Sequence, residues 1–164
     1  MAHLRKFSLM AATFLVITCA LHSAKAAEPP ADLCSLLPAA DVSKIMGRAY
    51  DPPEKSVAPR PFANTATGTD CHYSSKNSGG KLWFRAYVDP SPAAAAELFA
   101  KLSKFFGTPT PVSGIGDEAY LDAQHALHAR KGKVRFYINL GVDNFTPTIE
   151  KQIKDLGSKV AGQL

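Results

Sequence analysis

Two stretches of alternating apolar and polar residues predict the central strands of the protein. The apolar positions are Leu82, Phe84, Ala86 and Val88 in KLWFRAYV, and Val134, Phe136, Ile138 and Leu140 in KVRFYINL. A period of two is typical of a strand that buries one face. We therefore expect Phe84 and Phe136 to be equivalent core residues, so that replacing either by Ala is strongly destabilising.

Three stretches have helical spacing. Apolar residues recur at intervals of three to five between Leu33 and Met46, with an interruption at Pro38. Ser91-Pro92 and Thr146-Pro147 combine a capping side chain with a proline suited to the first helical position, so each predicts a helix start. These helices are expected to end at Gly107 and near Val160.

The remaining segments predict hairpins and one long loop. KNSGG separates CHYSS from KLWFRAYV, and Lys131-Gly132 lies between ALHAR and KVRFYINL; both are typical of hairpin turns. From Asp51 to Thr69 the chain contains four prolines and no apolar period. We expect a long loop there.

The element order indicates an internal repeat. Arg48-Ala49-Tyr50 matches Glu118-Ala119-Tyr120, and each long strand is followed by a helix that starts with proline. The predicted fold is α+β: an antiparallel sheet built from two βββα-like repeats, with the helices packed on one face and an N-terminal helix before them.

The N-terminus has the pattern of a signal peptide. Basic residues precede an apolar run over 7–21, which is shorter than a membrane-spanning helix, and Ala24-Lys25-Ala26 forms a small-residue cleavage site. We expect a signal peptide over 1–26, a proline-rich lead-in over 27–31 and a single α+β domain over 32–164. The mature chain would be exported, periplasmic or secreted, with no transmembrane segment after cleavage.

Charge adds little to this picture once the leader is removed. The chain has 19 Lys and Arg against 14 Asp and Glu, and loss of Arg5, Lys6 and Lys25 leaves 16 basic residues and the same 14 acidic ones. Nucleic-acid binding needs a dense cluster of cations. The sequence therefore predicts no nucleic-acid partner.

The three cysteines separate into two groups. Cys34 and Cys71 lie in the exported part, where an oxidising compartment favours a disulfide between them over two free thiols. Cys19 lies within the leader, and lipid attachment there is the alternative to cleavage after Ala26. Thr18 fits poorly before a lipidated cysteine, so cleavage is favoured.

Catalytic signatures are absent from the sequence. It contains no G-x-S-x-G, P-loop, H-E-x-x-H, C-x-x-C or dinucleotide-binding glycine pattern. Asp117 and Glu118 are adjacent on a predicted strand, as are Cys71 and His72, so the two side chains of each pair point to opposite faces. We predict no catalytic residues, no cofactor and no metal site.

The polar faces of the two long strands carry the candidate binding surface. It comprises Trp83, Arg85, Tyr87, Arg135 and Tyr137. Aromatic rings and guanidinium groups together are enriched where proteins recognise partners. We expect this surface to bind an anionic or glycan-like envelope component or a protein partner. In the alternative interpretation, the rings shield the sheet, stack with the arginines, or lie beneath the N-terminal helix or the long loop.

Short motifs along the chain resemble a class of small exported bacterial proteins and lipoproteins of unknown function. These motifs are CSLLPAADVSKIMG, CHY and GIGDEAYL followed by a basic hairpin, and the element order is similar to that of LpqN-type and PsbP-like domains. The resemblance implies a non-enzymatic envelope accessory or binding protein of unknown ligand. The alternative function is a small envelope hydrolase without a recognised motif.

Overall fold

The computed structural model describes residues 28–63, 65–77 and 79–164. The predicted signal peptide and its cleavage site lie outside these residues. Within them the elements are η1 (Leu33–Leu36), α1 (Ala39–Met46), β1 (Glu54–Ala58), β2 (Gly68–Ser74), β3 (Lys81–Val88), α2 (Pro92–Phe105), β4 (Thr110–Pro111), β5 (Glu118–Leu121), β6 (Leu127–Lys131), β7 (Val134–Asn139) and α3 (Pro147–Ala161).

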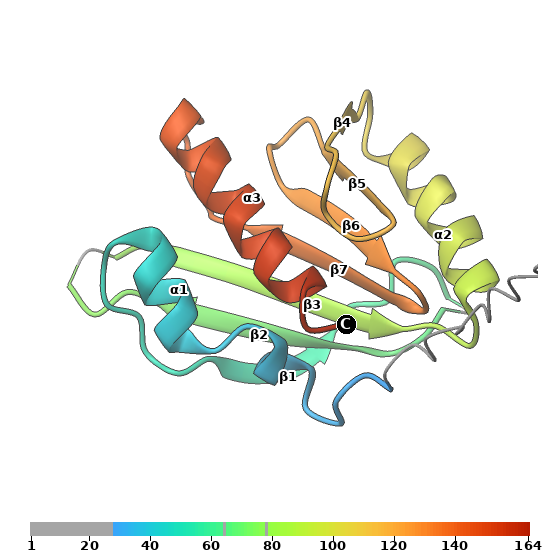
Figure 1. Cartoon of the computed structure of the whole chain (residues 1–164), viewed down its shortest axis with the longest axis horizontal. Coiled ribbons are helices and arrows are strands. Elements are labelled where there is room, and N and C mark those ends of the chain that lie inside the picture. The colour runs from blue at the N-terminus through green and yellow to red at the C-terminus, as the bar shows by residue number, and fades with distance from the viewer. Residues whose placement is uncertain (1–27, 64, 78) are drawn as a thin grey trace, which may run out of the picture.

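All seven strands form one antiparallel sheet in the order β1-β2-β3-β7-β6-β5-β4 (Figure 1). The first three strands and the last four are each joined as consecutive neighbours, and the two groups meet at the β3–β7 pair. The α+β class with an antiparallel sheet is therefore confirmed. β3 and β7 are the two strands whose alternation was read from the sequence.

One face of the sheet, which we call the inner face, forms the hydrophobic core. Phe84, Ile138 and Leu127 lie opposite one another across β3, β7 and β6, and all three are fully buried. Phe136 is also buried, and its ring meets that of Phe84 edge to face at 6.4 Å. The prediction that Phe84 and Phe136 are core residues is confirmed.

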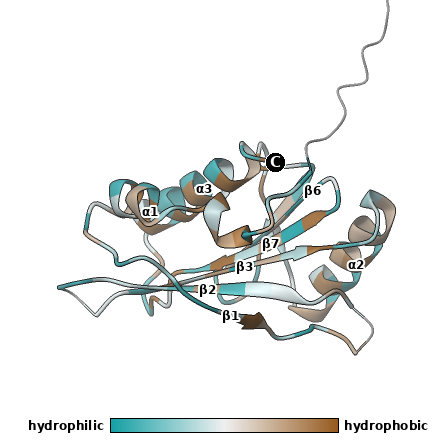
Figure 2. Cartoon of the chain, turned by 90° about the horizontal axis from the view of Figure 1, so that it is seen from below, coloured by the Kyte–Doolittle hydropathy of each residue, from teal (hydrophilic) through white to brown (hydrophobic). Residues whose placement is uncertain are grey.

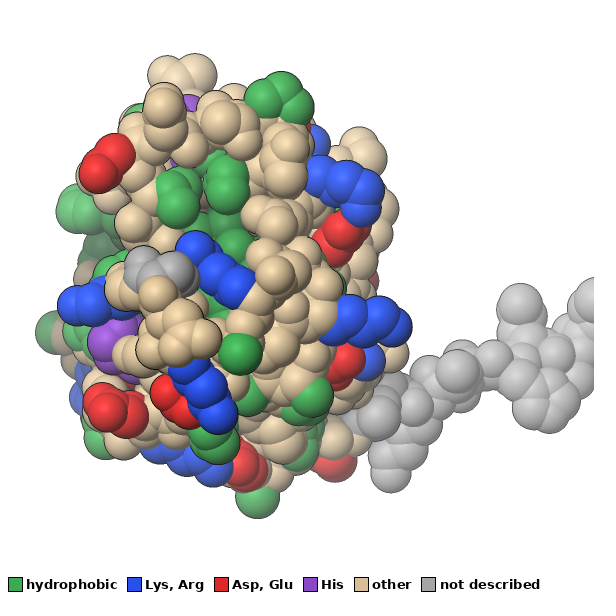
Figure 3. All heavy atoms as spheres, turned by 90° about the vertical axis from the view of Figure 1, so that its left-hand side faces the viewer, with side chains coloured by type: hydrophobic (Ala, Val, Ile, Leu, Met, Phe, Trp, Pro, Cys, Tyr) green, Lys and Arg blue, Asp and Glu red, His purple; other side chains and the backbone are tan. Residues whose placement is uncertain are grey.

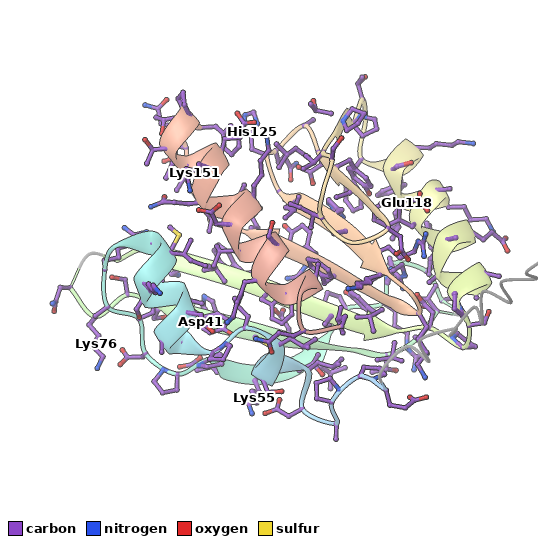
Figure 4. All side chains as sticks on the ribbon, in the orientation of Figure 1. Asp41, Lys55, Lys76, Glu118, His125 and Lys151 are labelled. Carbon is purple, nitrogen blue, oxygen red and sulfur yellow. A yellow bond between two sulfur atoms is a disulfide. The ribbon has the colours of Figure 1, made fainter. Side chains whose placement is uncertain are left out.

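The inner face is covered by α1 and α3. These helices lie side by side, joined by an ion pair between Lys159 and Asp41 at 3.1 Å and by a hydrogen bond from Gln152 to the carbonyl of Ile45 (Figure 4). α3 approaches the sheet so closely that a Cβ at Gly157 would overlap the side chain of Leu127.

The helix α2 corrects the prediction that the helices share one face. The ring of Phe99 lies 5.0 Å from that of Tyr120, and the ring of Phe106 lies 4.9 Å from that of His128. Tyr120 and His128 are paired across β5 and β6 and point away from the core. α2 therefore packs on the opposite, outer face, apart from α1 and α3 (Figure 2). Periodicity shows which side of a helix is apolar but not which side of the sheet it covers.

The starts of α2 and α3 follow the predicted capping chemistry. The Ser91 hydroxyl accepts a hydrogen bond from the amide of Ala94, and the Thr146 hydroxyl accepts one from the amide of Ile149. A proline follows each cap, as expected for a residue with a fixed φ and no donor N–H.

The predicted long loop contains a strand and the start of another. β1 occupies Glu54–Ala58, and β2 begins at Gly68. Four of the five β1 residues are exposed because β1 is an edge strand, so it shows no alternation in its apolar residues. The segment 48–50, which the internal repeat matches with 118–120 of β5, forms only an isolated bridge, between Tyr50 and Ser75.

The predicted disulfide joins Cys34 of η1 to Cys71 of β2 across 37 positions of sequence, and both residues are buried. The bond ties the N-terminal segment to the inner face of the sheet. In the described part of the chain, the longest helix, α3, has 15 residues, and no helix could span a bilayer.

Candidate functional site

Strand register organises the outer face into rows. One row runs across β2, β3, β7 and β6 as Asp70, Arg85, Tyr137 and His128. A second row runs across the same strands as Gly68, Tyr87, Arg135 and Arg130. Residues directly opposite on antiparallel strands share a face. The polar faces of β3 and β7 thus lie on the same side, as expected from the repeat.

Four of the five predicted residues line a hollow in this face. We call it the arginine–tyrosine hollow; its volume is about 240 Å³, and its floor includes Arg85, Tyr87, Arg135 and Tyr137. Its sides come from the loop after β1, from α2 and from the β5–β6 turn. The sequence therefore identified the floor, whereas the sides belong to segments distant in sequence.

Trp83 does not line the hollow. Its ring stacks on His72 at 5.1 Å, and a Cβ at Gly141 would lie only 2.5 Å from it. The turn after β7 therefore passes closely over the indole, and the amide of Gly141 donates to the side chain of Asn139, which lies opposite Trp83. Trp83 is half-buried and covers the outer face of the sheet outside the hollow.

Arg135 is a buried, paired cation. Its Nε donates to Asp89 Oδ2 at 2.5 Å and its Nη2 to Asp89 Oδ1 at 3.0 Å, and the side chains of both residues are less than 5% exposed. Arg130 lies directly opposite Arg135 and is paired with Asp117 and Glu118. Like charges facing each other are destabilising, so these carboxylates make the arrangement possible.

Arg85 is more open than Arg135. Its Nε donates to Asp70 Oδ2 at 3.0 Å, and its guanidinium lies 5.5 Å from the centre of the Tyr137 ring. Among the described residues, nothing accepts a hydrogen bond from its Nη1 or Nη2. Its side chain is 30% exposed, so these donors remain accessible from the hollow. A guanidinium with free donors is suited to carboxylate or phosphate oxygens.

Tyr87 connects the floor to the loop above it. Its hydroxyl donates to the carbonyl of Pro59 at 2.9 Å, and the Arg135 guanidinium stacks over its ring at 5.0 Å. The ring also lies against Gly68, where a Cβ would come within 2.5 Å of it. Burial raises the pKa of the Tyr87 phenol, so it remains a neutral donor. For Tyr87, the alternative that a ring lies beneath the long loop is confirmed.

The hollow also contains a carboxylate–imidazole pair that the sequence did not predict. His128 Nε2 lies 2.9 Å from Asp122 Oδ2, while Asp122 Oδ1 accepts from the amides of Gln124 and Ala126. Burial raises the pKa of Asp122, but the hydrogen bonds from His128 and the two amides outweigh it and hold that pKa below its usual range. An ionised Asp122 requires His128 to donate through Nε2. Asp122 directly after a strand was a recognisable turn feature; its link to His128 was not.

The apolar side of the hollow comes from α2 and from Phe106, the residue directly after it. Phe99, Leu102 and Phe106 line it. Across from them, Pro59, Arg60 and Pro61 form a strap, and the next residue, Phe62, meets Phe105 edge to face at 6.3 Å. The guanidinium of Arg60 donates to the neutral hydroxyl of Thr67, and among the described residues it forms no ion pair with a carboxylate.

The described lining residues of the hollow include no Ser, Thr or Cys, so its side-chain hydroxyls are the phenols of Tyr87 and Tyr137. The ring of Tyr137 lies 5.0 Å from that of His128. His125 lies outside the hollow, stacked on Phe145 near the start of α3 at 4.1 Å (Figure 4). Within the described residues, no group of three or more His, Cys, Asp or Glu could hold a metal ion.

Charges of both signs are interspersed on one end of the molecule. On the end of the molecule shown in Figure 3, Lys and Arg side chains lie beside Asp and Glu side chains, with no single positive area.

Comparison of the chain with protein-family models, curated proteins and solved structures finds no match, so the similarity to LpqN-type and PsbP-like domains remains a prediction from sequence motifs.

Proposed function

We propose that this chain is an exported binding protein of the bacterial envelope, without catalytic activity, that holds a small anionic ligand in the arginine–tyrosine hollow. One observation carries the proposal: Arg85 presents Nη1 and Nη2, which donate to no described residue, to a concave site floored by tyrosine rings. Concave sites with a few convergent polar groups among apolar walls are typical of small-molecule binding.

Three further features support the envelope part of the proposal. The N-terminal sequence has a leader pattern, the domain carries a buried disulfide, and short motifs resemble exported bacterial proteins. Intact-mass measurement of the protein after export tests it. A chain beginning at Ala27 is expected; a chain that retains residues 1–26, or a lipid adduct on Cys19, would contradict it.

The binding proposal is tested by calorimetric titration with small anions of different geometry: acetate, benzoate, phosphate and citrate. At least one is expected to bind the wild-type protein, with its affinity reduced about tenfold in Arg85→Gln. Gln keeps a donor for Asp70 but loses the charge and the free guanidinium donors. The domain is therefore expected to remain folded.

Arg48→Gln is the matched control. Arg48 also lies over a tyrosine, with its guanidinium 5.4 Å from the centre of the Tyr50 ring, and it does not line the hollow. Its substitution should leave anion binding unchanged. Binding that falls equally in both variants, or no binding by any anion in the series, would overturn the proposal.

The Asp122 and His128 pair favours a second candidate, a small hydrolase in which His128 activates water. An imidazole oriented by a carboxylate is the usual form of a general base. Hydrolysis of p-nitrophenyl acetate by wild-type and His128→Gln proteins tests it. Activity above the buffer rate that is lost in the variant, while anion binding is retained, would support the hydrolase over the binding protein.

A further inference from the structure

We infer that the ligand of the hollow is an amphipathic monoanion: a carboxylate carried on a short hydrocarbon chain or ring. This rests on the proposed function and names the ligand class of the same site. The head group would meet Arg85, and the hydrocarbon would lie against the α2 side.

The balance of charge favours a single negative charge. Three arginines line the hollow, Arg60, Arg85 and Arg135, together with one carboxylate, that of Asp122. Two of these cations are already in contact with carboxylates that lie behind them, Asp70 and Asp89. With Asp122 counted, the three arginines and three aspartates balance, so one added negative charge is tolerated better than two. A doubly charged phosphate would face three aspartates within the same small region, which costs Coulomb energy in a partly desolvated site.

The geometry of Arg85 also fits a planar head. Its Nε is occupied by Asp70, which leaves the two terminal nitrogens as a pair of parallel donors. Two parallel N–H groups match the two oxygens of a carboxylate. The guanidinium is held over the Tyr137 ring, so its orientation is largely set before a ligand arrives.

The opposite side of the hollow offers only apolar contacts to a ligand. Phe99 and Leu102 are buried residues of α2, and Phe106, directly after the helix, is half-buried beside them. The three side chains form one apolar wall facing the tyrosine floor. Each CH₂ group that leaves water against such a wall gains roughly 0.8 kcal/mol, or about fourfold in affinity. A purely polar anion leaves this wall uncovered.

Size and closure limit the hydrocarbon to a short one. The hollow holds about 240 Å³, below the roughly 300 Å³ at which ordinary small-molecule sites begin. The strap is fixed by the hydrogen bond between Tyr87 and Pro59 and by the contact between Phe62 and Phe105. A long acyl chain would need to displace it.

The experiment is calorimetric titration of the mature protein with hexanoate, acetate, 1-hexanol and inorganic phosphate. Hexanoate is expected to bind at least tenfold more tightly than acetate, which lacks the hydrocarbon. It should also bind at least tenfold more tightly than 1-hexanol, which lacks the charge. Phosphate should bind more weakly than hexanoate.

Two pairs of variants separate head from tail. Arg85→Gln should weaken hexanoate about tenfold and leave 1-hexanol unchanged, whereas Arg48→Gln should change neither. Phe106→Ala should reduce the ratio of hexanoate to acetate affinity at least threefold. Val57→Ala, a change at a 73% exposed side chain outside the lining, should not alter that ratio.

The results of these titrations distinguish the amphipathic ligand class from the anion site proposed above. Phosphate or acetate binding that depends on Arg85 and equals hexanoate binding would overturn the amphipathic class and leave the anion site standing. Equal affinity for 1-hexanol and hexanoate would overturn the role of the carboxylate. No binding of hexanoate, acetate or phosphate would overturn both.

Discussion

The two faces of the sheet are built from the same strands but are stabilised differently. On the inner face, Phe84, Ile138 and Leu127 form an apolar row that is closed by α1 and α3. On the outer face, the neighbouring row replaces these side chains with Arg85, Tyr137 and His128. The inner face is filled, whereas the outer face keeps paired charges around an open hollow. A single α+β domain can thus hold its fold on one side of a sheet and leave room for a ligand on the other.

The largest expected effect tests the inner face. Phe84→Ala and Phe136→Ala should each lower the free energy of unfolding by about 3 to 5 kcal/mol, because both side chains are buried and their removal leaves a cavity. Denaturant unfolding of the single variants measures this loss.

Val57→Ala is the control for these variants, since the Val57 side chain is 73% exposed; it should change stability by no more than about 0.5 kcal/mol. A loss below about 1 kcal/mol for both core variants would contradict the division of the sheet into a filled and an open face.

A similar effect is expected at the buried ion pair of the outer face. Asp89→Asn leaves the Arg135 guanidinium buried without a counter-charge, and it should cost about 3 to 5 kcal/mol. Asp155→Asn removes the partner of Lys151 in an exposed pair on α3, so it should cost no more than about 1 kcal/mol. Comparable small losses in both variants would show that the outer face is not held by its buried charges.

The disulfide anchors the inner face to the N-terminal segment. Replacing both Cys34 and Cys71 by Ala should cost about 3 to 4 kcal/mol, because the unfolded chain loses the constraint of a loop closed across 37 positions. Denaturant unfolding with and without a reductant provides the same comparison in the wild-type protein. Two alkylatable thiols in the unreduced exported protein would disprove the bond.

The smallest expected effect depends on pH and concerns the outer face alone. The pKa of Asp122 is lower in the folded state than its ordinary value of 3.8. At pH values between the folded-state pKa and 3.8, the unfolded state therefore binds more protons than the folded state. Asp122 therefore stabilises the fold fully above about pH 4. This stabilisation is lost as the pH falls through the folded-state pKa.

Unfolding of Asp122→Asn measured from pH 3 to pH 7 tests this prediction. The variant should be less stable than the wild type by about 1 to 3 kcal/mol at pH 7, and the difference should narrow toward pH 3. A difference that stays constant with pH would show that the Asp122 carboxylate is not held ionised by His128 and the two amides.

Local sequence was sufficient for the parts of this protein that depend on local chemistry. Alternation in 81–88 and 133–140 specified both faces of β3 and β7, because side chains on a strand alternate whatever lies above them. The caps Ser91 and Thr146 specified where two helices begin, since their hydroxyls act within three residues. The same alternation placed Arg85, Tyr87, Arg135 and Tyr137 on one side.

Tertiary structure decided what covers each face. Nothing in the period of α2 shows that it crosses to the outer face, and β1 has no apolar pattern because it is stabilised by pairing with β2. The partners of the site also lie far away in sequence: Asp89 and Arg135 are separated by 46 positions, and Pro59 meets Tyr87 across 28. Periodicity reports which residues share a face, but burial, ion pairing and the shape of a hollow depend on which distant segments pack over it.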